Sequence, residues 1–249
     1  MRPTLAGLSL ALLVLLGCKV ENALDFHTTP PPPPRGYAVL VDVSALRSRA
    51  ASATPNSNFA DALSIVRLVD SLMTPHLELA ALALDNAATH TVTQPYDYWT
   101  WPFDVTRGGV HYTGKLLGGR QGTFNAFRLA ISSTNASPPF ANFTLLNGQL
   151  DYLSTQGRWY VYDLKSSATD PVLGIAWVKT NTGVQIAIER PQELYGYEIN
   201  GGVHALRRMG NLPADAFSLI WTPADGAGKV SLGSADYRCW DAQQRNVAC

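Results

Sequence analysis

Residues 175–188 read IAWVKTNTGVQIAI, and this stretch decides the fold. Apolar residues alternate with small or polar ones over residues 175–177 and again over residues 184–188. A two-residue period places alternate side chains on opposite faces of a β-strand. Asn181-Thr182-Gly183, between the two runs, has the composition of a tight turn. The stretch therefore predicts a β-hairpin with one buried face.

The same period extends outward over most of the chain beyond residue 95, with clear runs at 99–105, 127–131 and 217–221. The spacing predicts an antiparallel meander of about eight to ten strands, with Pro102 confining its strand to an edge. No helical segment among the runs is long enough for a parallel crossover. The turns are expected at Arg107-Gly108-Gly109, Gly118-Gly119, Asn147-Gly148, Asn181-Thr182-Gly183, Asn200-Gly201-Gly202 and Asp225-Gly226.

A helical pair is predicted at about residues 58–88. Apolar residues recur at three- and four-residue steps over 59–73, after Asn58 as N-cap, and Pro75 begins a second helix that runs to about Asn86. No basic face accompanies the apolar one, so packing on a sheet is favoured over a membrane-surface helix. We expect a mainly β (α+β) fold in which the pair covers a long meander sheet, within one domain over residues 37–249.

The N-terminus carries an export signal. Residues 5–16 are apolar or small, a run too short to span a bilayer, and they lead into Leu15-Leu16-Gly17-Cys18. These four residues resemble the lipobox of bacterial lipoproteins. The resemblance implies that residues 1–17 are a signal peptide and that Cys18 carries diacylglycerol, with a further acyl chain such as palmitate. Ordinary secretory cleavage is the alternative.

The same resemblance implies a lipid-anchored protein of the bacterial cell envelope, whose partner is the bilayer that holds Cys18. In such lipoproteins an Asp after the cysteine commonly retains the product in the inner membrane. Lys19 stands there, which favours the outer membrane, with the leaflet left open. Residues 18–36 are expected to form a tether, because Pro30–Pro34 favours an extended polyproline II spacer. A ligand for a proline-recognising domain is the alternative.

Charge gives no sign of a nucleic-acid partner. Removal of residues 1–17 takes away one of the 19 basic residues and none of the 19 acidic ones, which leaves a formal charge of −1. A nucleic-acid binder would show a basic excess or stripe.

Cys239 and Cys249 are the other two cysteines, and in an exported chain an even pair predicts a disulfide. A structural zinc site would need two further ligands. A redox role would be expected to use the Cys-x-x-Cys spacing, which is absent.

Catalytic motifs are missing from the mature sequence, so we expect no enzyme, cofactor or metal. It contains no Gly-x-Ser-x-Gly, Ser-x-x-Lys or His-Glu-x-x-His. Residues 109–115 spell Gly-x-x-x-x-Gly-Lys, but Leu116 replaces the hydroxyl residue that holds magnesium. The histidines have no metal-ligand spacing, and they are His27, His76, His90, His111 and His204.

Aromatic residues give the only candidate contact sites for a ligand or partner. Strand alternation divides them between two faces, so that the tryptophans are expected in the core and some tyrosines outside. The candidates are Tyr96, Tyr98, Trp99, Trp101, Trp159, Tyr160 and Tyr162.

Three functions follow from these features. The first is a non-enzymatic, membrane-anchored envelope lipoprotein that binds a partner protein or has a structural role. The second is a carrier of an apolar ligand or lipid in a concave sheet. The order of helices before a meander resembles the half-barrel of lipoprotein carriers and related mycobacterial lipid-binding lipoproteins. The third is an envelope hydrolase.

Overall fold

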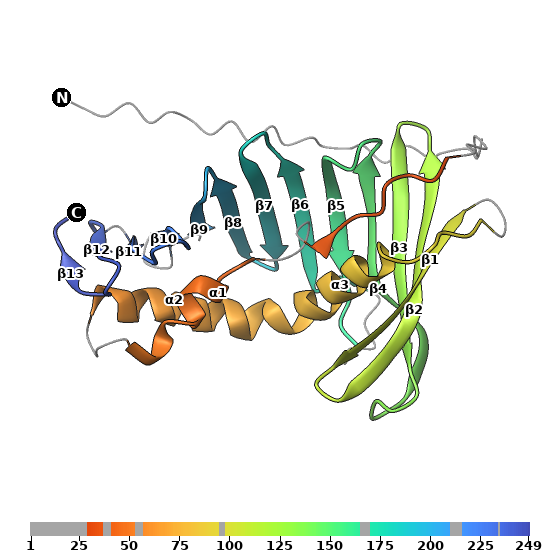
Figure 1. Cartoon of the computed structure of the whole chain (residues 1–249), viewed down its shortest axis with the longest axis horizontal. Coiled ribbons are helices and arrows are strands. Elements are labelled where there is room, and N and C mark those ends of the chain that lie inside the picture. Colours follow the sequence, from red (N-terminus) through yellow and green to blue (C-terminus); the bar gives the residue numbers. More distant parts are fainter. Residues whose placement is uncertain are drawn as a thin grey trace.

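The computed structural model describes residues 29–36, 41–52, 57–94, 98–164, 170–209, 216–233 and 235–249. The predicted signal peptide, Cys18, His27 and Tyr96 lie outside these ranges. The described chain forms a 13-stranded antiparallel sheet in which every strand pairs with its neighbours along the chain. The sheet is open and strongly curved, and two helices run along its concave side (Figure 1).

The predicted mainly β meander is confirmed, but its 13 strands exceed the predicted eight to ten. The C-terminal strands are too short to show a periodic pattern, with three residues in β12 and two in β13. The strands are β1 (Trp99–Arg107), β2 (Val110–Gln121), β3 (Phe124–Ser133), β4 (Phe140–Asp151), β5 (Gln156–Val161), β6 (Leu173–Lys179), β7 (Gly183–Arg190), β8 (Glu193–Asn200), β9 (Val203–Met209), β10 (Phe217–Trp221), β11 (Gly228–Leu232), β12 (Arg238–Trp240) and β13 (Asn246–Val247).

Pro102 lies on the first strand of the sheet, β1, as predicted. Thr100 directs its N–H away from β2, toward the carbonyl oxygen of Thr93 at 2.7 Å. Pro102 is two residues further along, so its nitrogen points to the same outer side, where no ladder hydrogen bond is lost.

Two predicted turns are wrong, because Gly118-Gly119 lies inside β2 and Asn147-Gly148 lies inside β4. Gly118 pairs with Phe127 and Gly148 pairs with Trp159 across the sheet. A β-carbon on Gly118 would lie 2.6 Å from the Phe127 ring, and one on Gly148 would lie 2.6 Å from the Trp159 ring. These glycines leave space for aromatic rings on neighbouring strands. The other predicted turns are confirmed.

The helical pair is confirmed as α2 (Asn58–Leu72) and α3 (Thr74–Ala87). The N-cap of α2 is Ser57 rather than the predicted Asn58, and the Ser57 hydroxyl accepts from Ala60 N at 3.1 Å. Asn58 instead bonds the C-terminal strands, donating from its side chain to Cys239 O at 2.7 Å and from its backbone to the Asn246 side chain at 2.8 Å.

The helices link the two ends of the curved sheet. α3 packs on β1 and β2, whereas α2 packs on β11 and β12 (Figure 1). An ion pair marks each end, Glu78–Arg107 at 2.8 Å and Asp61–Arg238 at 2.7 Å. The sheet is therefore an arc, and the helical pair is the chord that joins its ends.

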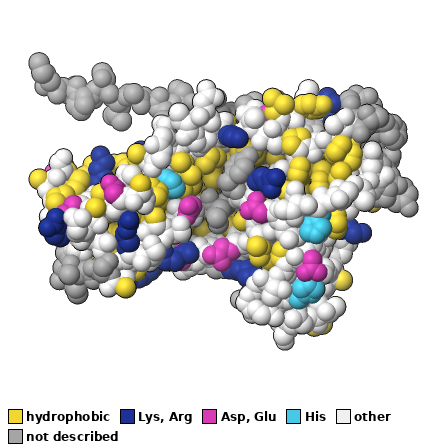
Figure 2. Space-filling model, viewed as in Figure 1, with side chains coloured by type: hydrophobic (Ala, Val, Ile, Leu, Met, Phe, Trp, Pro, Cys, Tyr) yellow, Lys and Arg dark blue, Asp and Glu magenta, His cyan; other side chains and the backbone are white. Residues whose placement is uncertain are grey.

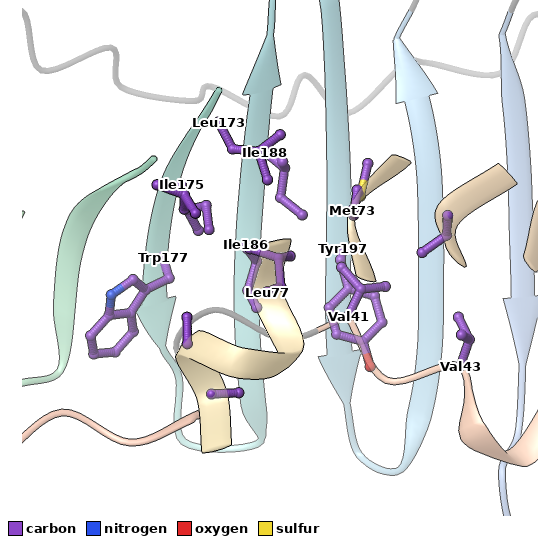
Figure 3. Close-up of a cluster of buried hydrophobic side chains, with 14 of the residues drawn as sticks. Val41, Val43, Met73, Leu77, Leu173, Ile175, Trp177, Ile186, Ile188 and Tyr197 are labelled. Carbon is purple, nitrogen blue, oxygen red and sulfur yellow. The ribbon is translucent and has the colours of Figure 1, made fainter. Parts of the chain in front are cut away.

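An N-terminal segment fills the space between arc and chord. It contains α1 (Ser44–Arg47) and a short 3-10 helix (Ala50–Ser52). Val41, Val43 and Leu46 are buried. Figure 3 shows Val41 beside Tyr197 of β8, Leu77 of α3 near Ile186 of β7, and Met73, between the two helices, near β8. The concave face of these central strands is thus covered by the chain itself.

The proline run differs from a free spacer. Pro31 and Pro34 are buried while Pro32 and Arg35 are exposed, which is the three-residue repeat of polyproline II with one face packed against the domain. Ser154 donates its hydroxyl to Pro32 O at 3.1 Å, and Gly36 N donates to the Asp85 side chain at 2.9 Å. From Thr29 onward, the predicted tether belongs to the folded part.

The predicted disulfide is present. Cys239 and Cys249 are bonded, with their Cα atoms 5.3 Å apart. The bond links β12 to the end of the chain, close to the N-terminus of α2 that Asn58 anchors.

Candidate functional site

The predicted aromatic contact residues divide between core and surface. Trp99, Trp101 and Trp159 are at most 4% exposed and face the concave side. Tyr98 and Tyr160 are 38% and 37% exposed, and Tyr162 is half-buried. The structure therefore gathers no single aromatic site from this set.

The buried tryptophans continue into a row of rings across alternate strands. Trp101 lies 5.9 Å from Phe127, and Phe127 lies 6.4 Å from Trp159, measured between ring centroids. The intervening strands present Gly118 and Gly148 to this row. The row of rings is part of the packed core. Of the predicted contact residues, only the exposed tyrosines are accessible to a partner.

A polar cluster is buried on the concave face. The Tyr197 hydroxyl lies 2.9 Å from Nδ1 of His204 and 3.4 Å from Asp42 O. Both contacts are satisfied when His204 Nδ1–H donates to the tyrosine oxygen and the tyrosine O–H donates to the carbonyl. Burial lowers the pKa of His204 and raises that of Tyr197, so both stay neutral near pH 7. The cluster fastens the N-terminal segment to β8 and β9.

Stability is expected to fall with acid because of His204. Its pKa is lowered by burial in the folded state, so below about 6.5, the ordinary value in an unfolded chain, protons bind preferentially to the unfolded state. We expect the free energy of unfolding to fall as pH drops from 7 to 5, by at most about 1.4 kcal/mol per pH unit from this residue. Urea unfolding at each pH measures it. His204→Gln should have a shallower slope, and an identical slope would contradict the assignment.

A shallow cleft, open to solvent, lies between α2 and β9–β11, with a volume of about 290 Å³. Arg208 on its wall donates to Glu193 at 2.8 Å, while Glu193 also accepts from Arg190 and Tyr195, each at 3.0 Å. Arg208 Nε has no hydrogen-bond partner within the described parts of the chain. Two guanidinium groups thus share one carboxylate, and Arg208 is the charged residue among the otherwise mostly apolar lining of the cleft. It is lined by Ser64, Ile65, Leu68, Arg208, Ala216, Phe217 and Leu232.

An exposed apolar cluster lies where the first described residues meet the sheet. Leu153 and Tyr152, in the β4–β5 turn, are 70% and 51% exposed, and Phe124 at the start of β3 is 38% exposed. The Arg120 guanidinium lies 4.4 Å from the centre of the Tyr152 ring. We call Phe124, Tyr152, Leu153 and Arg120 the apolar rim. The sequence signal for this cluster is the adjacent pair Tyr152-Leu153. The search for alternating apolar residues did not single it out.

Among the described residues, no group of three or more His, Cys, Asp or Glu side chains is placed to hold a metal ion. No described helix is long and apolar enough to cross a membrane. Comparisons of the chain with protein-family models, curated proteins and solved structures found no match.

Proposed function

We propose that this protein is a non-enzymatic lipoprotein of the bacterial cell envelope, anchored through acylated Cys18, with the outer membrane as its site. Its β-sheet domain binds an envelope partner or has a structural role close to the bilayer. The observation that carries the proposal is the docking of the proline run. It leaves only eleven residue steps between Cys18 and Thr29, a length suited to a short membrane tether.

Packing of the inner face supports a non-catalytic role. His204, the one buried histidine in the described ranges, is 8% exposed and bonds Tyr197. The exposed His111 pairs with Asp104 at 2.6 Å on the outer face. In both cases, the imidazole is bonded to a neighbouring side chain, and this contact accounts for its position without a catalytic role.

A second candidate, a binder of an apolar ligand, is favoured by the cleft beside α2. Val41, Val43, Met73 and Leu77 occupy the concave face of the central strands, so a ligand would be held at the edge of the helical pair instead. Arg208 would meet an anionic head group, and Ile65, Leu68 and Phe217 would contact its apolar part.

Replacement of Cys18 tests the anchor. Cells fed a labelled fatty acid should label the native protein, which should sediment with membranes, whereas Cys18→Ala should lose essentially all of the label because its thiol is the attachment point. The double variant Cys239→Ala/Cys249→Ala is the matched control and should keep the label. Equal labelling of native protein and Cys18→Ala would refute acylation at Cys18.

A further inference from the structure

We propose that the apolar rim lies in the interfacial layer of the same bilayer that holds the acyl chains of Cys18. The domain then rests on the membrane with the β4–β5 turn facing the lipid. This inference depends on the proposed function, because it requires the Cys18 anchor, and it adds the orientation of the domain.

The rim concentrates apolar surface at one end of the sheet. Single exposed apolar side chains are ordinary on protein surfaces. Here two adjacent residues of one turn are joined by a third on the neighbouring strand, because Phe124 pairs with Asp151, the residue before Tyr152. In Figure 2, hydrophobic side chains gather along the upper right of the molecule, with basic side chains among them. The three exposed apolar side chains thus come from two neighbouring strand ends on one side of the sheet.

The tether leads to this rim. The hydroxyl of Ser154, next to Leu153, binds the carbonyl of Pro32, and the first described residues meet the sheet beside the ends of β3 and β4 (Figure 1). Eleven residue steps from Cys18 to Thr29 span at most about 40 Å at 3.3–3.6 Å per residue. β4 has 12 residues, so the other end of this strand lies about 40 Å farther from the tether, at 3.4 Å per residue. A short tether therefore holds the apolar rim closer to the lipid than the opposite ends of the strands.

The side chains suit the boundary between water and lipid. Tyr152 has an apolar ring and a polar hydroxyl, a combination that favours the interface, and Leu153 is the more exposed of the two. Arg120 donates from Nε to Gly122 O at 3.3 Å, and its other guanidinium N–H groups would meet lipid phosphates beside the Tyr152 ring. Such a contact is weak for a free domain, but the anchor makes it intramolecular and so raises its effective concentration.

Tryptophan fluorescence in vesicles tests the orientation. Full-length acylated protein is reconstituted in vesicles of phosphatidylethanolamine and phosphatidylglycerol that contain phospholipid brominated in its acyl chains. Leu153→Trp adds an indole at the rim, and Met209→Trp adds one at a site that is 50% exposed at the opposite end of the sheet. The six native tryptophans are at most 4% exposed, so the native protein supplies a background that can be subtracted.

We expect brominated lipid to quench the indole added in Leu153→Trp at least threefold more than the one added in Met209→Trp. Acrylamide in the aqueous phase should show the reverse order. Equal quenching by lipid, in protein that carries the fatty-acid label, would overturn the orientation and leave the anchor intact. Loss of the label itself would instead refute the proposed function.

Discussion

Replacing Trp159 by alanine is expected to bring the domain close to unfolding. Trp159 is fully buried at the centre of the ring row, and removal of a buried tryptophan costs about 3–5 kcal/mol through lost burial and the cavity left behind. Domains are commonly stable by about 5–15 kcal/mol, so this is a large share of the total. The midpoint of urea unfolding measures the effect. Since Trp159 Nε1 has no partner within the described chain, the substitution leaves no partner group unsatisfied.

Tyr160→Ala is the matched control on the next residue of β5. Tyr160 is 37% exposed on the outer face, and its ring is stacked only by Arg158 at 5.2 Å among the contacts seen in the described residues. We expect it to cost less than about 1 kcal/mol. If Trp159→Ala were as mild as Tyr160→Ala, the assignment of Trp159 to the packed core would be wrong.

Gly148→Ala is expected to destabilise the domain by about 2–3 kcal/mol, although it adds one methyl group. The new β-carbon would overlap the carbonyl oxygen of Arg158 and would lie 2.6 Å from the Trp159 ring. The carbonyl belongs to the paired backbone of β4 and β5, so relief requires the strands to separate or the ring to leave its position. Thermal unfolding and near-ultraviolet circular dichroism of the tryptophans measure both effects.

Gly196→Ala separates this clash from the general effect of glycine in a strand. A β-carbon on Gly196 meets only the end of the Met209 side chain, at an ordinary 3.9 Å. Alanine there should leave stability unchanged or raise it slightly, because glycine in a strand interior carries an entropic cost. Similar losses in both variants would refute the steric explanation for Gly148.

Alternation in the sequence was sufficient to predict the sheet, because it records which face of each strand is buried. The run Ile175 to Ile188 and the edge position of Pro102 are both observed. The turns predicted at Gly118 and Gly148 were wrong, since a glycine at a turn and a glycine that leaves space for a neighbouring ring look identical in a sequence. The difference lies in Phe127 and Trp159, which the register places on the adjacent strands.

The candidate site was less predictable for a related reason. The proline run has the composition of a free spacer, and its packing depends on Ser154 and Asp85, which are distant in the sequence. The cleft at Arg208 likewise joins α2 to strands more than 130 residues later in the chain. A local sequence pattern describes one segment alone. The contacts of the proline run and of the cleft join segments that are distant in the sequence, and they form only in the folded, curved sheet.

The chord formed by α2 has a kinetic consequence. Neighbouring strands meet by closing short loops, whereas Asn58 meets Cys239 and Asn246 only after closing loops of 181 and 188 residues. Loop entropy makes the longer closure costlier by about 3 kcal/mol when the intervening chain is unfolded. We therefore expect each strand of the meander to pair with its neighbour first. The contact between α2 and the C-terminal strands should form last. Because the chain is synthesised from its N-terminus, α2 must wait for the C-terminal strands before it can dock on them.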